Sequence, residues 1–240
     1  MSKYGQLAAA LRNDIEDGTY SAGDRLPTTP ELCEKYGVSN TTVKKAIDEL
    51  EQLGLIARRR GSGIYVKSTV SLRRSMQGGL STSGQMNGLS AELADTGIVV
   101  TSDVHDFSIV HPSADVADAL DISTKEFVYK ICRVRLTDNK PRSVEYTYMP
   151  LTLVPGLLEE HLHGSIYGYL THELGLKIGS AHRVLKAAMP TEDECEWLRL
   201  GPNDPVFEVK QVGYLDDGTP YEYSTTHHTS DYEFFVVSTY

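Results

Sequence analysis

The sequence has few cysteines and no long apolar run. Its three cysteines, Cys33, Cys132 and Cys195, lie far apart, and none belongs to a CxxC motif. This spacing disfavours a disulfide framework or a zinc site and favours reduced thiols. No apolar stretch approaches the roughly 18 residues that a membrane-spanning helix needs, and the charged N-terminal segment lacks the layout of a signal peptide. We therefore expect a cytoplasmic protein with no membrane partner.

Positive charge is also scarce, and most of what there is gathers at one end. Residues 1–78 carry 12 Lys and Arg against 9 Asp and Glu, a net charge of +3, whereas the remainder carries 11 against 24, a net charge of −13. Only the N-terminal part therefore suits a polyanionic partner. We predict two domains, 1–67 and 89–240, joined by a linker over 68–88 that is rich in Ser, Gly and Thr. Such a linker allows the domains to reorient, or it is simply a solvated tether.

Three helices are expected in the first domain. Leu7, Leu11 and Ile15 recur every four residues and predict a helix over 4–17. The sequence Thr28-Thr29-Pro30-Glu31 is typical of a capping box and predicts a short second helix that ends at Gly37.

The third helix has the pattern of a recognition helix for DNA. Ser39 is placed to cap it, and Val43, Ile47 and Leu50 form its inward stripe. Small polar and basic residues are left facing outward near its start, namely Asn40, Thr41, Thr42, Lys44 and Lys45. A short helix, a turn and a helix that begins this way suit docking in the major groove.

A basic hairpin is predicted after the third helix. Apolar runs at 55–57 and 64–66 flank the segment Arg58-Arg59-Arg60-Gly61-Ser62-Gly63. The arginines suit phosphate or minor-groove contacts, and the glycines allow the backbone to approach a groove closely. An isolated segment of this kind is often only a solvated turn, but the order of helix, turn, helix and basic hairpin is far more specific.

The first domain resembles the winged helix-turn-helix of the GntR family of bacterial regulators. The matching stretches are Arg25–Thr28, Leu32, Gly37–Ala46, Leu50, Gly54–Ile56 and Gly61–Val66. The resemblance implies that double-stranded DNA is the partner. The expected DNA-binding residues are Arg25, Thr28, Ser39, Asn40, Thr41, Thr42, Lys44, Lys45, Arg58, Arg59, Arg60, Gly61 and Gly63.

Three positions depart from that family. Thr29 stands where the family usually has Glu, and Asn40 and Lys44 stand where it has Arg, at positions that touch DNA. Because Asn can read adenine bidentately and Lys still neutralises phosphate, we infer a different operator sequence and not a loss of binding.

The acidic part predicts an α+β fold with a mainly antiparallel sheet. Strands are expected over 99–110, 126–136, 141–149, 177–188, 206–215, 221–228 and 233–238. Helices are expected over 89–93, from Ser113 to Leu120, from Ser165 to Leu174, and after a capping box that begins at Thr191.

A candidate anion site follows from the alternation of one strand. Arg133 and Arg135 fall on one face, opposite Cys132 and Val134, and paired arginines suit a bidentate phosphate or carboxylate. Two ordinary surface arginines would give the same pattern. The helix start at Ser165 also favours an anion. Glu145 and Glu222 are expected in the middle of strands. Each could hold sugar hydroxyls or an amine, or could be an ordinary surface acid.

The second domain resembles the effector domain of the HutC subfamily, a fold shared with chorismate lyase. The motifs are Lys130–Leu136, Val144-Glu145, Tyr148–Pro150, Ser165–Tyr167 and Gly218–Tyr223. In the branch that senses amino-sugar phosphates, the resemblance implies a phosphate site of Ser90, Arg133, Arg135 and Ser165, with the two acids at the sugar. The other expected effector-binding residues are Leu89, Ile166, Tyr167 and His228.

Two departures in this domain leave the sugar open. His228 stands where the family usually has Tyr, and Thr229 replaces a common Arg. The resemblance implies a homodimeric repressor of carbohydrate-uptake or catabolic genes. We expect it to be relieved by a small-molecule effector of the glucosamine 6-phosphate or N-acetylglucosamine 6-phosphate type.

Two alternatives stay open. The first is the same architecture sensing a non-phosphorylated organic acid. The second is an enzyme with a lyase-like fold, although the sequence shows no nucleophile–base pairing, metal-ligand cluster or phosphate loop. The adjacent residues His227 and His228 would point to opposite faces of a strand, which disfavours a shared metal ion. We expect no catalytic residue, metal or cofactor.

Overall fold

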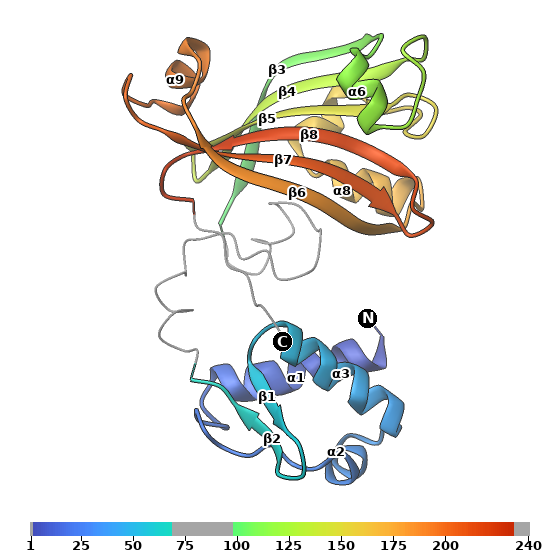
Figure 1. The fold of residues 1–240 in the computed structure, drawn as a ribbon, viewed down its shortest axis with the longest axis vertical. Coiled ribbons are helices and arrows are strands. Elements are labelled where there is room, and N and C mark those ends of the chain that lie inside the picture. The colour runs from blue at the N-terminus through green and yellow to red at the C-terminus, as the bar shows by residue number, and fades with distance from the viewer. Residues whose placement is uncertain (1, 69–97, 233–240) are drawn as a thin grey trace. The chain divides into compact units, whose positions relative to one another are not determined.

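A computed structural model describes residues 2–68 and 98–232, which divide into two compact units (Figure 1). Three features of the sequence analysis lie outside the described residues: the linker beyond Ser68, the helix over 89–93 with Leu89 and Ser90, and the strand over 233–238. No helix in the described part of the chain is both long and apolar enough to cross a membrane.

The first unit is a three-helix module with a hairpin. Its elements are α1 (Lys3–Glu16), α2 (Thr29–Tyr36), α3 (Asn40–Gln52), β1 (Ile56–Arg59) and β2 (Gly63–Val66). The predicted apolar stripes meet in one core, where Leu11, Leu32 and Leu50 are fully buried. A Glu31 carboxylate oxygen accepts hydrogen bonds from the Thr28 N–H at 2.7 Å and the Thr28 hydroxyl at 2.8 Å, which fixes the start of α2 as the capping box predicts.

The hairpin is tighter than the sequence pattern indicates. Arg59 pairs with Gly63 in the antiparallel ladder, so Arg58 and Arg59 belong to β1 and only residues 60–62 form the turn. The predicted loop over 58–63 was therefore too long. The antiparallel pairing extends to Arg59 and Gly63, and the Ser62 N–H closes the turn by donating to the Arg59 carbonyl at 2.9 Å.

The second unit is built on one antiparallel sheet of six strands in the order β3-β4-β5-β8-β7-β6. The strands are β3 (Val100–Val110), β4 (Val128–Thr137), β5 (Lys140–Pro150), β6 (Ile178–Ala188), β7 (Val206–Leu215) and β8 (Pro220–His228). The turn from β4 to β5 places Asp138 and Asn139 at positive φ, as a two-residue hairpin requires. Strands β4 and β5 lie inside the sheet, with neighbours on both sides.

Helices cover both faces of this sheet. On one face lie α6 (Ala114–Ala119) and α9 (Glu192–Leu198), and Leu198 packs there on Cys132, Val134 and Val144 (Figure 1). The other face carries α7 (Glu159–His163) and α8 (Ile166–Gly168), which continues into a π-helical turn (Tyr169–Glu173). The single helix predicted from Ser165 to Leu174 is thus an α-turn followed by a π-turn, and α7 was not predicted.

A buried carboxylate attaches α9 to the sheet. Glu194 is 1% exposed, and its oxygens accept hydrogen bonds from the Thr191 N–H, the Tyr146 hydroxyl and His227 Nδ1, each at 2.8 Å. Burial alone would raise the pKa of Glu194, but these hydrogen bonds lower it to about 2. The same contact with Glu194 raises the pKa of His227.

We predict that acid weakens the second unit through this contact. The folded-state pKa of Glu194 lies below its unfolded value, so its stabilisation is present above pH ~4.5 and is lost as pH falls toward 2, by about 3 kcal/mol in total. The raised pKa of His227 arises from the same contact: its stabilisation is present below pH ~6.5, is lost as pH rises through the folded-state pKa, and is not counted a second time in the acid loss. Urea unfolding of the Glu194→Gln variant between pH 5 and pH 2 should therefore show a smaller loss than the wild type.

The matched control is Glu192→Gln, an exposed acid on the same helix. Its unfolding should keep the wild-type dependence on pH. Equal dependence in the Glu194→Gln variant and the wild type would contradict the role given to Glu194.

Candidate DNA interface and effector site

The start of α3 presents the residues that the sequence assigns to DNA. Asn40, Thr41, Lys44 and Lys45 are exposed, while Val43 and Ile47 on the same helix are buried. The Ser39 hydroxyl caps the helix by accepting from the Thr42 N–H at 3.3 Å. The remaining N–H groups of the first turn and the two lysines give this end of the helix a positive potential.

The three arginines of the hairpin have different surroundings. Arg58 pairs with Asp48 and Glu51 of α3, with 3.3 Å between Arg58 Nε and a Glu51 oxygen, so it attaches the hairpin to the helix. The Arg59 guanidinium lies 5.0 Å from the centre of the Tyr65 ring, and Arg60 is exposed in the turn. The sequence pattern could not separate these roles, because the ion pairs depend on how α3 and β1 pack.

Gly63 is favoured by its backbone conformation and lies close to the Arg25 side chain. It has a φ of +127°, and a Cβ at this position would lie 2.6 Å from Arg25 Nε. Arg25 also forms an isolated bridge to Tyr65 of β2. The exposed Arg25 thus lies alongside β2, and Thr28 serves as the N-cap of α2.

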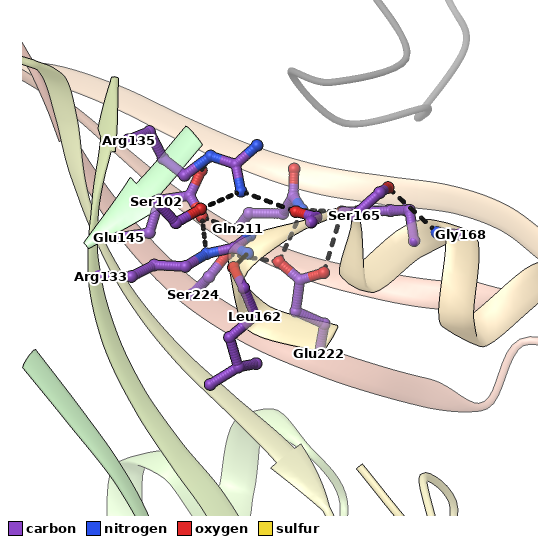
Figure 2. Close-up of polar contacts among 12 residues, drawn as sticks. Ser102, Arg133, Arg135, Glu145, Leu162, Ser165, Gly168, Gln211, Glu222 and Ser224 are labelled. Atoms are coloured by element: carbon purple, nitrogen blue, oxygen red, sulfur yellow. Dashed lines mark hydrogen bonds and ion pairs between the residues drawn. The ribbon is translucent and has the colours of Figure 1, made fainter. Parts of the chain in front are cut away.

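The paired arginines of β4 are buried. Arg133 is 6% exposed and Arg135 is 2% exposed, so the alternative of two ordinary surface arginines is wrong. Both lie on the sheet face that α7 and α8 cover, together with Glu145 of β5 (Figure 2). Arg133 Nε and Nη2 each lie 2.7 Å from one Glu145 oxygen, and Arg135 Nε lies 4.0 Å from the other.

The two guanidiniums also hold the segment that leads into α8. Arg133 Nη1 donates to the Leu162 carbonyl at 3.0 Å, and Arg135 Nη1 donates to the Gly164 carbonyl at 3.2 Å and to the Ser102 hydroxyl at 2.9 Å. Ser165 follows directly and caps α8 by accepting from the Gly168 N–H at 3.1 Å (Figure 2). The arginine pair and the predicted helix start therefore lie together.

Glu222 belongs to a second polar group on the same sheet face. Its carboxylate accepts from the Ser224 hydroxyl at 2.7 Å, the Tyr167 hydroxyl at 2.9 Å and Gln211 Nε2 at 3.2 Å. The Gln211 oxygen in turn accepts from Arg183 Nε at 2.6 Å. Burial raises the pKa of Glu222, although the hydrogen bonds from Ser224 and Tyr167 lower it in part.

Burial and neighbouring charges shift the pKa values of the other ionisable groups in the cluster. Burial raises the pKa of Glu145, but the two arginines outweigh burial and the net shift is downward. Burial lowers the pKa of Arg135 to about 10, so Arg135 stays charged at pH 7. Burial lowers the pKa of His228 to about 4, so His228 is neutral at pH 7.

The two adjacent histidines lie on opposite faces of the sheet. His228 stacks on Tyr232 with ring centres 3.9 Å apart, whereas His227 contacts Glu194. The two imidazoles do not converge on one ion.

Sequence reasoning missed Ser102, Gln211 and Ser224. Gln211 is a buried amide in a valine-rich strand, and that mismatch was a usable signal. Ser102 had none, because its contact with Arg135 depends on the register between β3 and β4. Ile166 was assigned to the effector, but its side chain is 2% exposed and packs in the core, which leaves only its backbone for a ligand.

The combination of these two units defines the class of protein. A helix-turn-helix with a basic hairpin, joined to a sheet domain with a buried cationic cluster, is a DNA-binding regulator with a ligand-binding domain. Residues 3–66 match the family model "Bacterial regulatory proteins, gntR family", and residues 95–233 match the UTRA domain. The chain belongs to the GntR family, with a UTRA domain as its second unit, as the sequence motifs predicted.

Known transcription regulators match this chain over nearly its whole length. The HTH-type transcriptional regulator GmuR of Bacillus subtilis is 34% identical over 238 residues, covering 99% of this chain and 98% of GmuR. The mannosyl-D-glycerate transport/metabolism system repressor MngR of Escherichia coli is 29% identical, covering 98% and 95%. The crystal structure of the possible transcriptional regulator YydK from Bacillus subtilis covers all of both chains with a TM-score of 0.81 at 30% identity. The prediction of a DNA-binding transcription regulator, and not an enzyme, is confirmed.

We predict that Arg60 contributes a phosphate contact. If the exposed Arg60 side chain neutralises one phosphate, Arg60→Ala should weaken binding and reduce the slope of log K against log salt by about 0.9. Fluorescence anisotropy with a bound duplex between about 50 and 200 mM salt measures this slope. The control is Lys210→Ala, which removes an exposed cation from the second unit and should leave the slope unchanged. An unchanged slope for Arg60→Ala would remove the turn from the interface.

Proposed function

We propose that this protein is a homodimeric cytoplasmic repressor of carbohydrate-uptake or catabolic genes, relieved by a phosphorylated sugar of the glucosamine 6-phosphate or N-acetylglucosamine 6-phosphate type. The observation that carries the proposal is the buried pair Arg133 and Arg135 at the start of α8. Two guanidiniums side by side offer parallel N–H donors, the arrangement that a phosphate accepts best.

Charge balance supports an anionic ligand. The described cluster brings two guanidinium cations against Glu145, while burial raises the pKa of Glu222. A phosphate near the two arginines would offset the cost of burying them and accept their donors. Ser165 would supply a hydroxyl and the first N–H groups of α8 to the same anion.

The rest of the cluster suits the hydroxyls and amine of a sugar. Glu145, Glu222, Tyr167 and Gln211 place carboxylate, hydroxyl and amide groups on one sheet face. His228, neutral at pH 7, lies near Glu145 at the end of β8. The relative MngR is named for a system that handles mannosyl-D-glycerate, a sugar derivative, which supports a carbohydrate role for this chain as well.

Effector binding would be coupled to operator binding through the segment that precedes α8. A phosphate would compete for the same donors that now hold the Leu162 and Gly164 carbonyls, so the occupied and empty forms would differ in where this segment lies. In a homodimer that binds a palindrome, the two helix-turn-helix units must lie one turn of DNA apart, roughly 34 Å. A ligand that favours a different placement would weaken operator binding by its differential affinity for the two forms.

A non-phosphorylated organic acid is the second candidate, because a carboxylate also fits an arginine pair. The two candidates respond differently to competition. Inorganic phosphate or sulfate should compete with a sugar phosphate at the arginines, and they should compete weakly with an acid held mainly by its carbon skeleton.

We predict that Arg133→Ala and Arg135→Ala each abolish the response to the effector and leave operator binding intact, because both arginines lie in the second unit. The measurement is release of an operator duplex during titration with glucosamine 6-phosphate and N-acetylglucosamine 6-phosphate. Arg135→Lys keeps the charge but loses the paired donors, so it tests the geometry if the alanine variants unfold.

Lys130→Ala is the matched control. Lys130 lies on the same strand but on its opposite face, where it pairs with Asp106 at 2.7 Å. This variant should respond as the wild type does. A normal response from both arginine variants would rule out the arginine pair as the effector site.

A further inference from the structure

Asn40 is the first residue of α3 and an exposed member of the candidate DNA interface. The Cys33 thiol of α2 donates a hydrogen bond to Asn40 Oδ1 with a sulfur–oxygen distance of 3.1 Å. The contact crosses the turn between the two helices of the helix-turn-helix. The orientation of Asn40 therefore depends on a residue seven positions earlier in the chain.

Cys33 is itself well fixed. Its carbonyl accepts the N–H of Gly37, which caps α2, and the N–H of Val38 at 3.2 Å. Its half-buried side chain packs against the core of the first unit. The backbone of Cys33 is thus fixed at the C-terminal end of α2, next to the start of α3.

The contact determines which part of the Asn40 amide faces outward. The oxygen and nitrogen of a carboxamide diverge from the same carbon, so holding Oδ1 against Cys33 turns Nδ2 and its two donors away from the protein. Bidentate reading of adenine needs both an acceptor and a donor from the amide, for N6 and N7 respectively. Guanine instead offers two acceptors, N7 and O6.

We propose that Cys33 is a positioning residue that sets base preference: by holding Asn40 Oδ1, it makes Asn40 a donor that selects guanine over adenine. This inference rests on the proposed role of α3 as the recognition helix. It differs from the expectation that Asn40 reads adenine bidentately, because with Oδ1 turned toward Cys33 the donor group Nδ2 faces outward.

The test is selection of bound duplexes from a random pool by the full chain. The variant Asn40→Ala should lose preference at one base position, which identifies the contacted base. At that position the wild type should favour guanine over adenine by about fivefold or more, the lower end of what a good base contact gives. Cys33→Ala releases Oδ1 and should remove this preference or turn it toward adenine.

Cys33→Ser is the conservative variant, since its hydroxyl also donates to Asn40, and it should keep guanine. Cys195→Ala, which removes a thiol from the second unit, should leave the whole profile unchanged.

Two outcomes overturn the inference alone: adenine at the Asn40-dependent position in the wild type, or an unchanged profile in Cys33→Ala. If Asn40→Ala changes no position, Asn40 is not a reading residue and the inference fails with that role. If the wild type enriches no sequence at all, the proposed recognition helix fails as well.

Discussion

Burial of two arginines on one face of a sheet is the constraint on which the second unit depends. An isolated cation under a protein surface is costly, and it is tolerated only with a paired charge and satisfied donors. Arg133 obtains these from Glu145 and the Leu162 carbonyl, and Arg135 obtains them in part from Ser102 and the Gly164 carbonyl. These partners come from β3, β5 and the segment before α8, so the arginines specify how four parts of the chain meet. The same donors are what an anionic ligand would need.

The opposite face of the sheet packs against α9. There, α9 is attached through Glu194 to Tyr146 and His227, and an apolar cluster around Val134 and Val144 fills the space beneath. Strand alternation separates the two functions so sharply that His227 and His228, neighbours in sequence, join different groups with opposite shifts in pKa. A ligand on one face therefore acts on the sheet and the α7–α8 segment without exchanging contacts with α9.

Local features were predicted well from the sequence. The caps at Thr28, Ser39 and Thr191 gave the helix starts, and strand alternation placed Arg133 and Arg135 on one face. Their burial was not predictable, because α7, whose Leu162 carbonyl accepts from Arg133, was not predicted. The partners Ser102 and Gln211 depend on strand order and register, which are set by the whole sheet. Arg58 was grouped with the hairpin tip because its ion pairs with α3 are tertiary contacts.

In both units, single side chains form the contacts that position the candidate binding groups. Arg58 joins the basic hairpin to α3 through its ion pairs, and Cys33 contacts the carboxamide at the start of α3. In the second unit, the backbone carbonyls before α8 occupy donors that an anion would take. If effector and operator favour different forms of this arrangement, each must weaken the binding of the other by the same factor.

The most direct measurement is the affinity of the full chain for glucosamine 6-phosphate, by calorimetry, with and without a saturating operator duplex. We expect the operator to weaken effector binding by the same factor by which the effector weakens operator binding. Equal effector affinity in the two experiments, or no binding of the sugar phosphate at all, would contradict it.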